Sequence, residues 1–181
     1  MYPTISKLLR PALAVAFASI TFVSAAQAEK FTFHGASQFD EKHAFTRLMR
    51  KFEQLTKLYY SGPHEIEFVM HLNSELGLEK DYVAYMNQGI SVDYAVASPS
   101  HMSTFSKLAT VLDPPMLYRD AGHWSKVLSG NVLQPVVDDI YKRADILLLG
   151  YGGGGVRHLI VNKPVSNMAE IKNVPIRVMG A

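Results

Sequence analysis

The chain has 181 residues, of which 48% are hydrophobic and 19% are charged, a balance typical of a globular protein and not of a disordered or collagen-like chain. It contains no cysteine, which excludes a disulfide framework, a cysteine-ligated zinc site and a thiol nucleophile. The formal net charge is only +2, so the basic excess that nucleic-acid binding usually requires is missing.

Residues 1–28 have the three-part pattern of a secretory signal peptide. Lys7 and Arg10 provide a positive start, residues 11–24 form an apolar run, and Ala26-Gln27-Ala28 is a small-x-small cleavage site. The alternative is a membrane anchor, but the apolar run is shorter than the about 20 residues that a transmembrane helix requires. The sequence therefore predicts export, with cleavage after Ala28.

Beyond this segment, strand-like and helix-like spacings of apolar residues follow one another along the chain. Strands are predicted at residues 30–35, 65–71, 91–97, 146–149, 156–161 and 175–179. Helices are predicted at residues 40–60, 79–88, 101–111, 121–129, 132–144 and 166–172. Such an order predicts the α/β class, with a largely parallel sheet that helices cover on both faces.

A glycine-rich segment, Gly150 to Gly155, matches the G-x-G-x-x-G pattern of dinucleotide-binding proteins. That kind of site requires a helix directly after the glycines, whereas residues 156–161 have a strand-like pattern. We therefore interpret these glycines as a flexible connector between two packed units.

Motifs of catalysis or metal binding are missing from the sequence. The seven histidines are scattered and form no H-E-x-x-H or other metal-ligand spacing. His101 lies near Ser98 and Ser100, but closeness in sequence does not make a catalytic triad. An exported α/β enzyme such as a hydrolase stays open as an alternative, although no G-x-S-x-G elbow is present.

Two arginines accompany the apolar segments near the end of the chain. Arg177 lies inside the apolar sequence Pro-Ile-Arg-Val-Met, where a guanidinium needs an acceptor. Composition favours an acidic side chain of the protein as that acceptor, and an anionic ligand is the alternative. Arg157 opens the segment after the glycines.

Several short segments along the chain carry a family resemblance in their order. They are NSELG at 73–77, MNQG at 86–89, VDY at 92–94, VLDPPMLYRD at 111–120, residues 152–157, NKPV at 162–165 and IRV at 176–178. In this order they resemble the DctP family, the extracytoplasmic solute-binding proteins of tripartite ATP-independent periplasmic (TRAP) transporters.

The resemblance implies a periplasmic-binding-protein-like fold. Residues 29–153 would form a first lobe, and residues 154–181 a hinge strand followed by the opening β-α-β unit of a second lobe. The family continues well beyond this point, so we expect the chain to be the N-terminal portion of a receptor. If 181 residues are the whole product, the cleft should close poorly and bind ligand weakly or not at all.

The resemblance also implies a function without catalysis, cofactor or metal. A periplasmic, monomeric receptor would capture a small organic acid and deliver it to TRAP permease subunits in the membrane, with no role for nucleic acid. Arg177 matches the family arginine that binds the ligand carboxylate at two points, and Arg157 matches a second family arginine. Ala36, Ser98 and His101 match further pocket positions. A solute-binding protein of another transporter class, whose ligand need not be an acid, is the remaining alternative.

Overall fold

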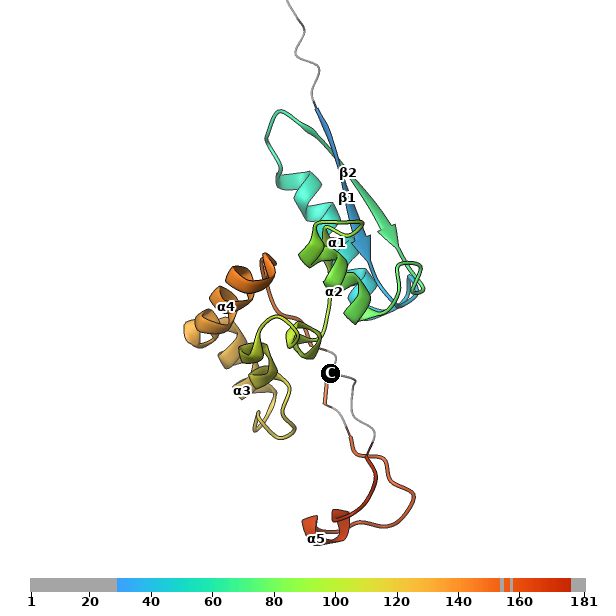
Figure 1. Cartoon of the computed structure of the whole chain (residues 1–181), viewed down its shortest axis with the longest axis vertical. Coiled ribbons are helices and arrows are strands. Elements are labelled where there is room, and N and C mark those ends of the chain that lie inside the picture. The colour runs from blue at the N-terminus through green and yellow to red at the C-terminus, as the bar shows by residue number, and fades with distance from the viewer. Residues whose placement is uncertain (1–28, 154, 157, 177–181) are drawn as a thin grey trace, which may run out of the picture.

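The computed structural model describes residues 29–153, 155–156 and 158–176 (Figure 1). Its sheet consists of three parallel strands in the order β2-β1-β3. The strands are β1 (Lys30–Ala36), β2 (Glu65–His71) and β3 (Tyr94–Ala95). Two helices, α1 (Ala44–Tyr59) and α2 (Glu79–Gln88), make the two crossovers that parallel strands require. The predicted α/β class with a parallel sheet is confirmed.

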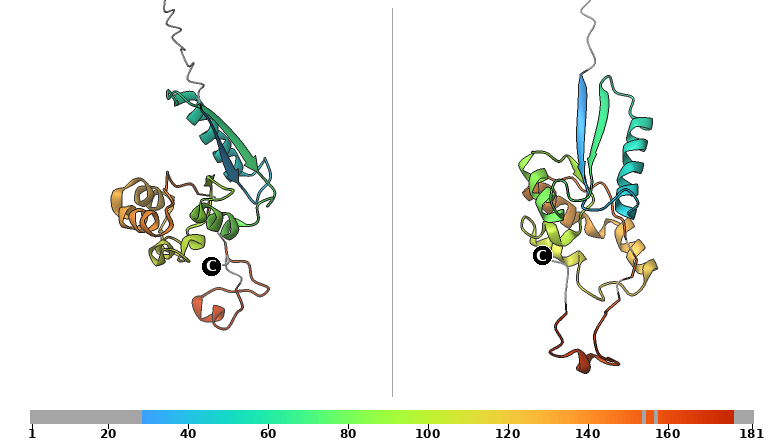
Figure 2. Two further views of the ribbon diagram at one scale, coloured as in Figure 1. Left: turned by 45° about the horizontal axis from the view of Figure 1, so that its top comes forward. Right: turned by 90° about the vertical axis from the view of Figure 1, so that its right-hand side faces the viewer.

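In the second half of the described chain, the regular elements are all helices, joined by long irregular segments. It contains the short 3-10 helices η1 (Pro99–Met102), η2 (Lys107–Leu112) and η3 (Asn131–Leu133) and the α-helices α3 (Ala121–Ser129), α4 (Gln134–Ala144) and α5 (Met168–Ile171). Helices α3 and α4 lie beside each other, whereas α5 lies at the far end of an extended arm (Figures 1 and 2). None of the helices within the described ranges combines the length and hydropathy of a membrane span.

One buried cluster joins the sheet to the helices. Ala36 at the end of β1, Tyr82 and Val83 on α2, and Ile140 on α4 are all at most 1% exposed and belong to this cluster. Because the cluster lies at the carboxyl end of β1, it fixes α2 and α4 near the edge of the sheet where the loops after the strands begin.

The two faces of the sheet differ in cover. Helix α1 lies against the face that carries Phe68, since Phe52 packs against that ring with a centroid distance of 6.2 Å. On the other face, Lys30 and Glu67 form an exposed ion pair at 2.8 Å. The expectation that helices cover both faces is therefore wrong for the first half of the strands, where charged side chains face water.

Gly35 on β1 allows α1 and β3 to approach each other. A Cβ atom at this position would lie 2.3 Å from Cζ of Tyr94, so only glycine leaves room for the tyrosine ring. The Tyr94 hydroxyl donates a hydrogen bond of 2.5 Å to Oε1 of Glu53 on α1. Burial, together with the neighbouring Glu53 carboxylate, raises the pKa of Tyr94.

Several element boundaries agree with the sequence predictions. β2 and α2 have the predicted bounds, and Gly89 ends α2 with a left-handed φ of 66°. Helix α1 begins at Ala44 and not at residue 40, because Oδ1 of Asp40 accepts the N–H groups of Lys42 and His43 in a separate turn.

Other predicted elements are shorter or different. The strand expected at 91–97 consists of Tyr94–Ala95 only, and η1 and η2 replace the helix expected at 101–111. The backbone is broken there at Ser106, whose buried hydroxyl donates to Oδ2 of Asp139 on α4. The helix expected at 132–144 starts as η3 and becomes α4 only at Gln134, one residue before Pro135, which is tolerated in a first helical turn. The helix expected at 166–172 is reduced to α5, which Asn167 caps.

The predicted strands at 146–149 and 156–161 are wrong for the described residues of these segments. The chain there is not helical and belongs to no sheet. Of the strand predicted at 175–179, residues 177–179 lie outside the described residues, and residues 175–176 are not in a strand.

Candidate functional site

The carboxyl ends of the three parallel strands meet at one edge of the sheet. Ser37 and Gln38 follow β1, Asn73 and Ser74 follow β2, and Ser98 comes three residues after β3. Ligands of open α/β sheets bind outside this edge, so the loops that begin here form the candidate site.

Hydrogen bonds hold the first two loops together. The backbone N–H of Ser37 donates to the carbonyl of His71 at 2.9 Å, and the N–H of Asn73 donates to the carbonyl of Phe39 at 3.1 Å. Asn73 and Ser74 both have a positive φ, of 54° and 60°, which turns the chain sharply after β2. The first two loops therefore form one connected polar rim.

Glu79, the first residue of α2, joins this rim to the loop after β3. Its side chain is almost fully buried, with the residue 2% exposed. Oε1 accepts from Nε2 of Gln38 at 3.0 Å, and Oε2 accepts from the backbone N–H of Ser98 at 2.7 Å. Nε2 of His101 lies 3.4 Å from the same Oε2. One buried carboxylate thus positions groups from three different segments.

The packing around Glu79 extends into the core. Tyr82, one helical turn further along α2, donates its hydroxyl to the carbonyl of Val96 at 3.3 Å. Burial and the nearby Glu79 carboxylate raise the pKa of Tyr82. Glu79 and Tyr82 lie three residues apart on one face of α2, so the approach of the chain to Ser98 is anchored there at two points.

The structure places three of the predicted site residues at this edge. Ala36 ends β1, paired with Ala95 of β3, and is 1% exposed, so it contributes shape and no polar group. Ser98 directly precedes η1 and His101 lies within it, and both contact Glu79 through the bonds described above. The other two predicted residues, Arg157 and Arg177, lie outside the described residues, and their role stays a prediction.

Sequence reasoning missed Glu79 and Gln38. The available signal was weak: an acidic residue in the first turn of a helix usually faces water and the helix dipole. Here Asp81 serves the helix start instead, because its Oδ2 accepts the N–H of Leu78 at 2.8 Å. Glu79 can therefore turn inward and accept hydrogen bonds from the loops.

A second set of polar contacts links β1 to β2 through two histidines. Nδ1 of His34 and Nε2 of His71 are 3.1 Å apart, and Nδ1 of His71 lies 2.9 Å from Oε1 of Glu75. Within the described part of the chain, no three such side chains are arranged to hold a metal ion.

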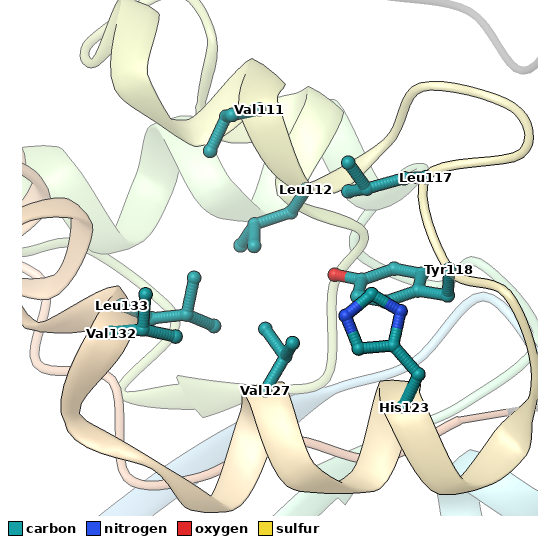
Figure 3. A pocket seen from close by; sticks show the side chains of 8 residues that line it. All are labelled: Val111, Leu112, Leu117, Tyr118, His123, Val127, Val132 and Leu133. Atoms are coloured by element: carbon teal, nitrogen blue, oxygen red, sulfur yellow. The ribbon is translucent and has the colours of Figure 1, made fainter.

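Two cavities lie away from this edge. The first, of about 190 Å³, is lined by apolar side chains of η2 and α3 together with Tyr118 and His123 (Figure 3). The second, of about 470 Å³, lies between α3, α4 and residues 148–151. Neither contains Ala36, Ser98 or His101 in its lining, so both cavities are separate from the polar rim of the candidate site.

Comparisons with known proteins identify relatives over most of the chain. Residues 35–181 match DctP, the bacterial extracellular solute-binding protein family 7. A solute-binding protein of Sulfitobacter sp. (strain NAS-14.1) is 45% identical over 166 residues, which are 92% of this chain and 49% of that protein. The 2,3-diketo-L-gulonate-binding periplasmic protein YiaO of Escherichia coli is 26% identical over 84% of this chain and 44% of its own length.

Solved structures share the fold. A TRAP periplasmic solute-binding protein from Sulfitobacter sp. NAS-14.1, crystallised with bound α-D-taluronate, aligns with a TM-score of 0.70 and 46% identity over 75% of this chain and 44% of that chain. A TRAP periplasmic solute-binding protein from Rhodobacter sphaeroides, in an open form without ligand, aligns with a TM-score of 0.66 and 22% identity over 80% and 46%. The chain thus spans about half the length of the relatives it matches.

These matches confirm the family that the order of short segments indicated, and with it the periplasmic-binding-protein-like fold. The family match begins within β1 and extends over the glycine-rich segment to the last residue. The chain belongs to the DctP family of bacterial extracellular solute-binding proteins.

Proposed function

We propose that this chain provides the first lobe of a receptor that captures a small organic acid in the periplasm and delivers it to the permease subunits of a TRAP transporter. The observation that carries the proposal is the 46% identity to a TRAP solute-binding protein that holds α-D-taluronate. We therefore propose a sugar acid of the hexuronate class as the ligand.

The polar rim offers groups that suit such a ligand. A hexuronate carries several hydroxyl groups besides its carboxylate, and hydroxyls both donate and accept hydrogen bonds. Gln38, Ser98 and His101 are all half-buried at the edge of the sheet, and Glu79 fixes their positions through its two carboxylate oxygens. Rigid placement of polar groups lowers the entropic cost of binding.

We propose that Arg177 and Arg157 bind the carboxylate of the ligand. A guanidinium presents two parallel N–H donors that match the two oxygens of a carboxylate, which the ammonium of lysine cannot do. Closure of a second lobe over the rim would exclude water and strengthen these bonds. Cleavage after Ala28, periplasmic location and a monomeric state are parts of the same proposal.

The known relatives are solute-binding proteins, and we propose the same role, without catalysis, for this chain. The local geometry supports this choice over a hydrolase. In the described residues, the hydroxyl of Ser98 lies 3.1 Å from that of Ser100, and the hydrogen bonds found there include none from Ser98 to the His101 ring. Such a contact is what activates a serine nucleophile through its base.

Replacement of the predicted carboxylate-binding arginine tests the proposal. The mature chain, continued by the part of the Sulfitobacter relative that this chain does not cover, is titrated with D-taluronate by calorimetry. Arg177→Lys should weaken binding at least about tenfold, because one bond to a charged group contributes about 1.5–3 kcal/mol. Arg119→Lys, an exposed substitution, is the matched control and should leave the affinity unchanged. An unchanged affinity in Arg177→Lys would contradict the assigned role.

A further inference from the structure

The first of the two cavities, here called the η2–α3 cavity, combines aliphatic walls with two polar groups. It has a volume of about 190 Å³. Its walls are six valine and leucine side chains from η2, α3, η3 and the segment before α3 (Figure 3). The remaining members of the lining are Tyr118 and His123. The Tyr118 hydroxyl and one ring nitrogen of His123 point into the cavity (Figure 3).

The η2–α3 cavity has a buried floor and an apolar mouth. Leu133 is 7% exposed and belongs to the core cluster, and Leu112 and Val127 pack against that cluster. Val111 and Val132, by contrast, are 48% and 67% exposed. A ligand that fills the cavity would remove apolar surface at this mouth from water, which is favourable in proportion to the area covered.

Backbone contacts fix the His123 ring and the position of its proton. The N–H of His123 donates to Oδ1 of Asp120, the residue that caps α3, at 2.7 Å. The N–H of Arg119 donates to Nδ1 of the His123 ring at 3.3 Å. Because Nδ1 accepts this bond, the neutral ring carries its proton on Nε2. Nε2 is therefore the nitrogen that can donate a hydrogen bond into the cavity.

The Tyr118 hydroxyl supplies the second polar group. The rings of Tyr118 and His123 meet edge to face with their centroids 5.9 Å apart, so both polar groups lie on the same side of the cavity. Burial and the nearby Asp113 carboxylate raise the pKa of Tyr118, and its protonated hydroxyl can donate as well as accept. Among the described residues, neither this hydroxyl nor Nε2 of His123 has a hydrogen-bond partner.

Volume and lining together define a class of ligand. An apolar cavity of about 150 Å³ binds benzene, so one six-membered ring with a small substituent suits the about 190 Å³ of this cavity. A purely apolar ring would leave both polar groups without a partner, which is unfavourable. A single hydroxyl on the ring can bond to both at once. The described lining offers a carboxylate neither arginine nor lysine.

We propose that the η2–α3 cavity is a second ligand site, which binds a compact six-membered ring that carries one hydroxyl group, such as a monocyclic phenol. The ring lies between the aliphatic walls, and its hydroxyl bonds to Nε2 of His123 and to the hydroxyl of Tyr118. The cavity shares no lining residue with the polar rim at the edge of the sheet. The proposal therefore goes beyond the organic-acid function and does not rest on it.

Binding of phenol and of benzene to the full exported chain tests the proposal. The titrations are followed by the methyl NMR signals of Val127 and Leu133, which line the cavity. We expect saturable shifts, with phenol bound about fivefold more tightly than benzene, because one net hydrogen bond contributes about that factor. A cavity that made no polar contact would favour benzene, since the phenol hydroxyl would lose its bonds to water.

A matched pair of tyrosine substitutions isolates the polar contact. Tyr118→Phe removes the hydroxyl and keeps the ring, so the affinity for phenol should fall about fivefold while the affinity for benzene stays unchanged. Tyr141→Phe makes the same change on α4, at a side chain that is 55% exposed and lies outside the cavity lining. This control should leave both affinities unchanged.

Cavity-filling substitutions locate the site. Val127→Phe should fill the η2–α3 cavity and abolish phenol binding. Val137→Phe adds the same ring to the second cavity, which Val137 lines, and should leave phenol binding intact. Circular dichroism checks that these variants fold. Val132→Phe, at the exposed mouth, is a second blocking variant should Val127→Phe fail to fold.

Four results overturn the proposal: no saturable shifts, tighter binding of benzene than of phenol, equal effects of the two tyrosine substitutions, or phenol binding that Val137→Phe abolishes and the blocking variants leave intact. None of these results bears on the organic-acid function, because the titration with D-taluronate tests a residue outside the cavity lining.

Discussion

Removal of the Glu79 carboxylate should destabilise the fold at the candidate site. Glu79→Ala deletes the acceptor for Nε2 of Gln38 at 3.0 Å and for the N–H of Ser98 at 2.7 Å. A hydrogen bond to a charged group contributes about 1.5–3 kcal/mol, so the two bonds together contribute about 3–6 kcal/mol. Because the substitution also removes the cost of burying a carboxylate, the net loss of unfolding free energy should lie at the lower end of this range, about 3 kcal/mol.

The amide variant should cost much less. In Glu79→Gln, the side-chain oxygen can still accept from Ser98, and Gln38 can rotate its amide to accept from the new N–H₂ group. Both half-buried partners then keep a hydrogen bond, although neither bond involves a charge, so we expect a loss of about 1 kcal/mol.

Urea unfolding followed by circular dichroism measures these differences. Glu75→Ala is the control, because the Glu75 side chain is 61% exposed and pairs with His71 at the surface, and exposed pairs contribute about 0–1 kcal/mol. The expected order of destabilisation is Glu79→Ala, then Glu79→Gln, then Glu75→Ala. A Glu79→Ala variant as stable as Glu75→Ala would refute the reasoning that this carboxylate holds the loops together.

Two further predictions concern the contact between α1 and the sheet. Gly35→Ala should lower the free energy of unfolding in urea by about 1–3 kcal/mol, since its methyl group would lie 2.3 Å from the Tyr94 ring. Gly150→Ala is the control and should be neutral, because the space around its Cβ is open. Equal effects of the two substitutions would count against this packing. Because the pKa of Tyr94 is raised from its ordinary value of 10.0 by burial and by Glu53, its unfolded form releases the proton first. Stability should therefore be retained below pH 10 and fall above it. The fall should be smaller in Tyr94→Phe, and superimposable pH profiles would be inconsistent with a buried tyrosine.

The sequence predicted those elements whose partners are local or lie within the described chain. β2 and α2 were predicted with their exact bounds, because periods of 2 and 3.6 residues directly reflect one buried face. The predicted strands at 146–149 and 156–161 have the composition of strands, but a strand requires a neighbour that the described residues do not provide. Periodicity reports the face that a segment can bury and not whether a partner is present.

Long-range polar contacts were beyond sequence reasoning. The bond from Ser106 to Asp139 spans 33 residues and lies where η1 and η2 replace the helix expected at 101–111. Glu79 was missed for the same reason, since its partners Gln38 and Ser98 lie 41 and 19 residues away. Ser98 and His101 were found only through the family resemblance.

Calorimetric titration of the receptor with an acid and its neutral counterpart tests the central claim most directly. D-Taluronate and D-talose differ in the carboxylate at carbon 6, so the comparison isolates the charge. The mature chain, continued by the part of the Sulfitobacter relative that it does not cover, should bind D-taluronate at least about tenfold more tightly than D-talose. Equal affinity for the two sugars, or tighter binding of D-talose, would contradict the account of this chain as half of an organic-acid receptor.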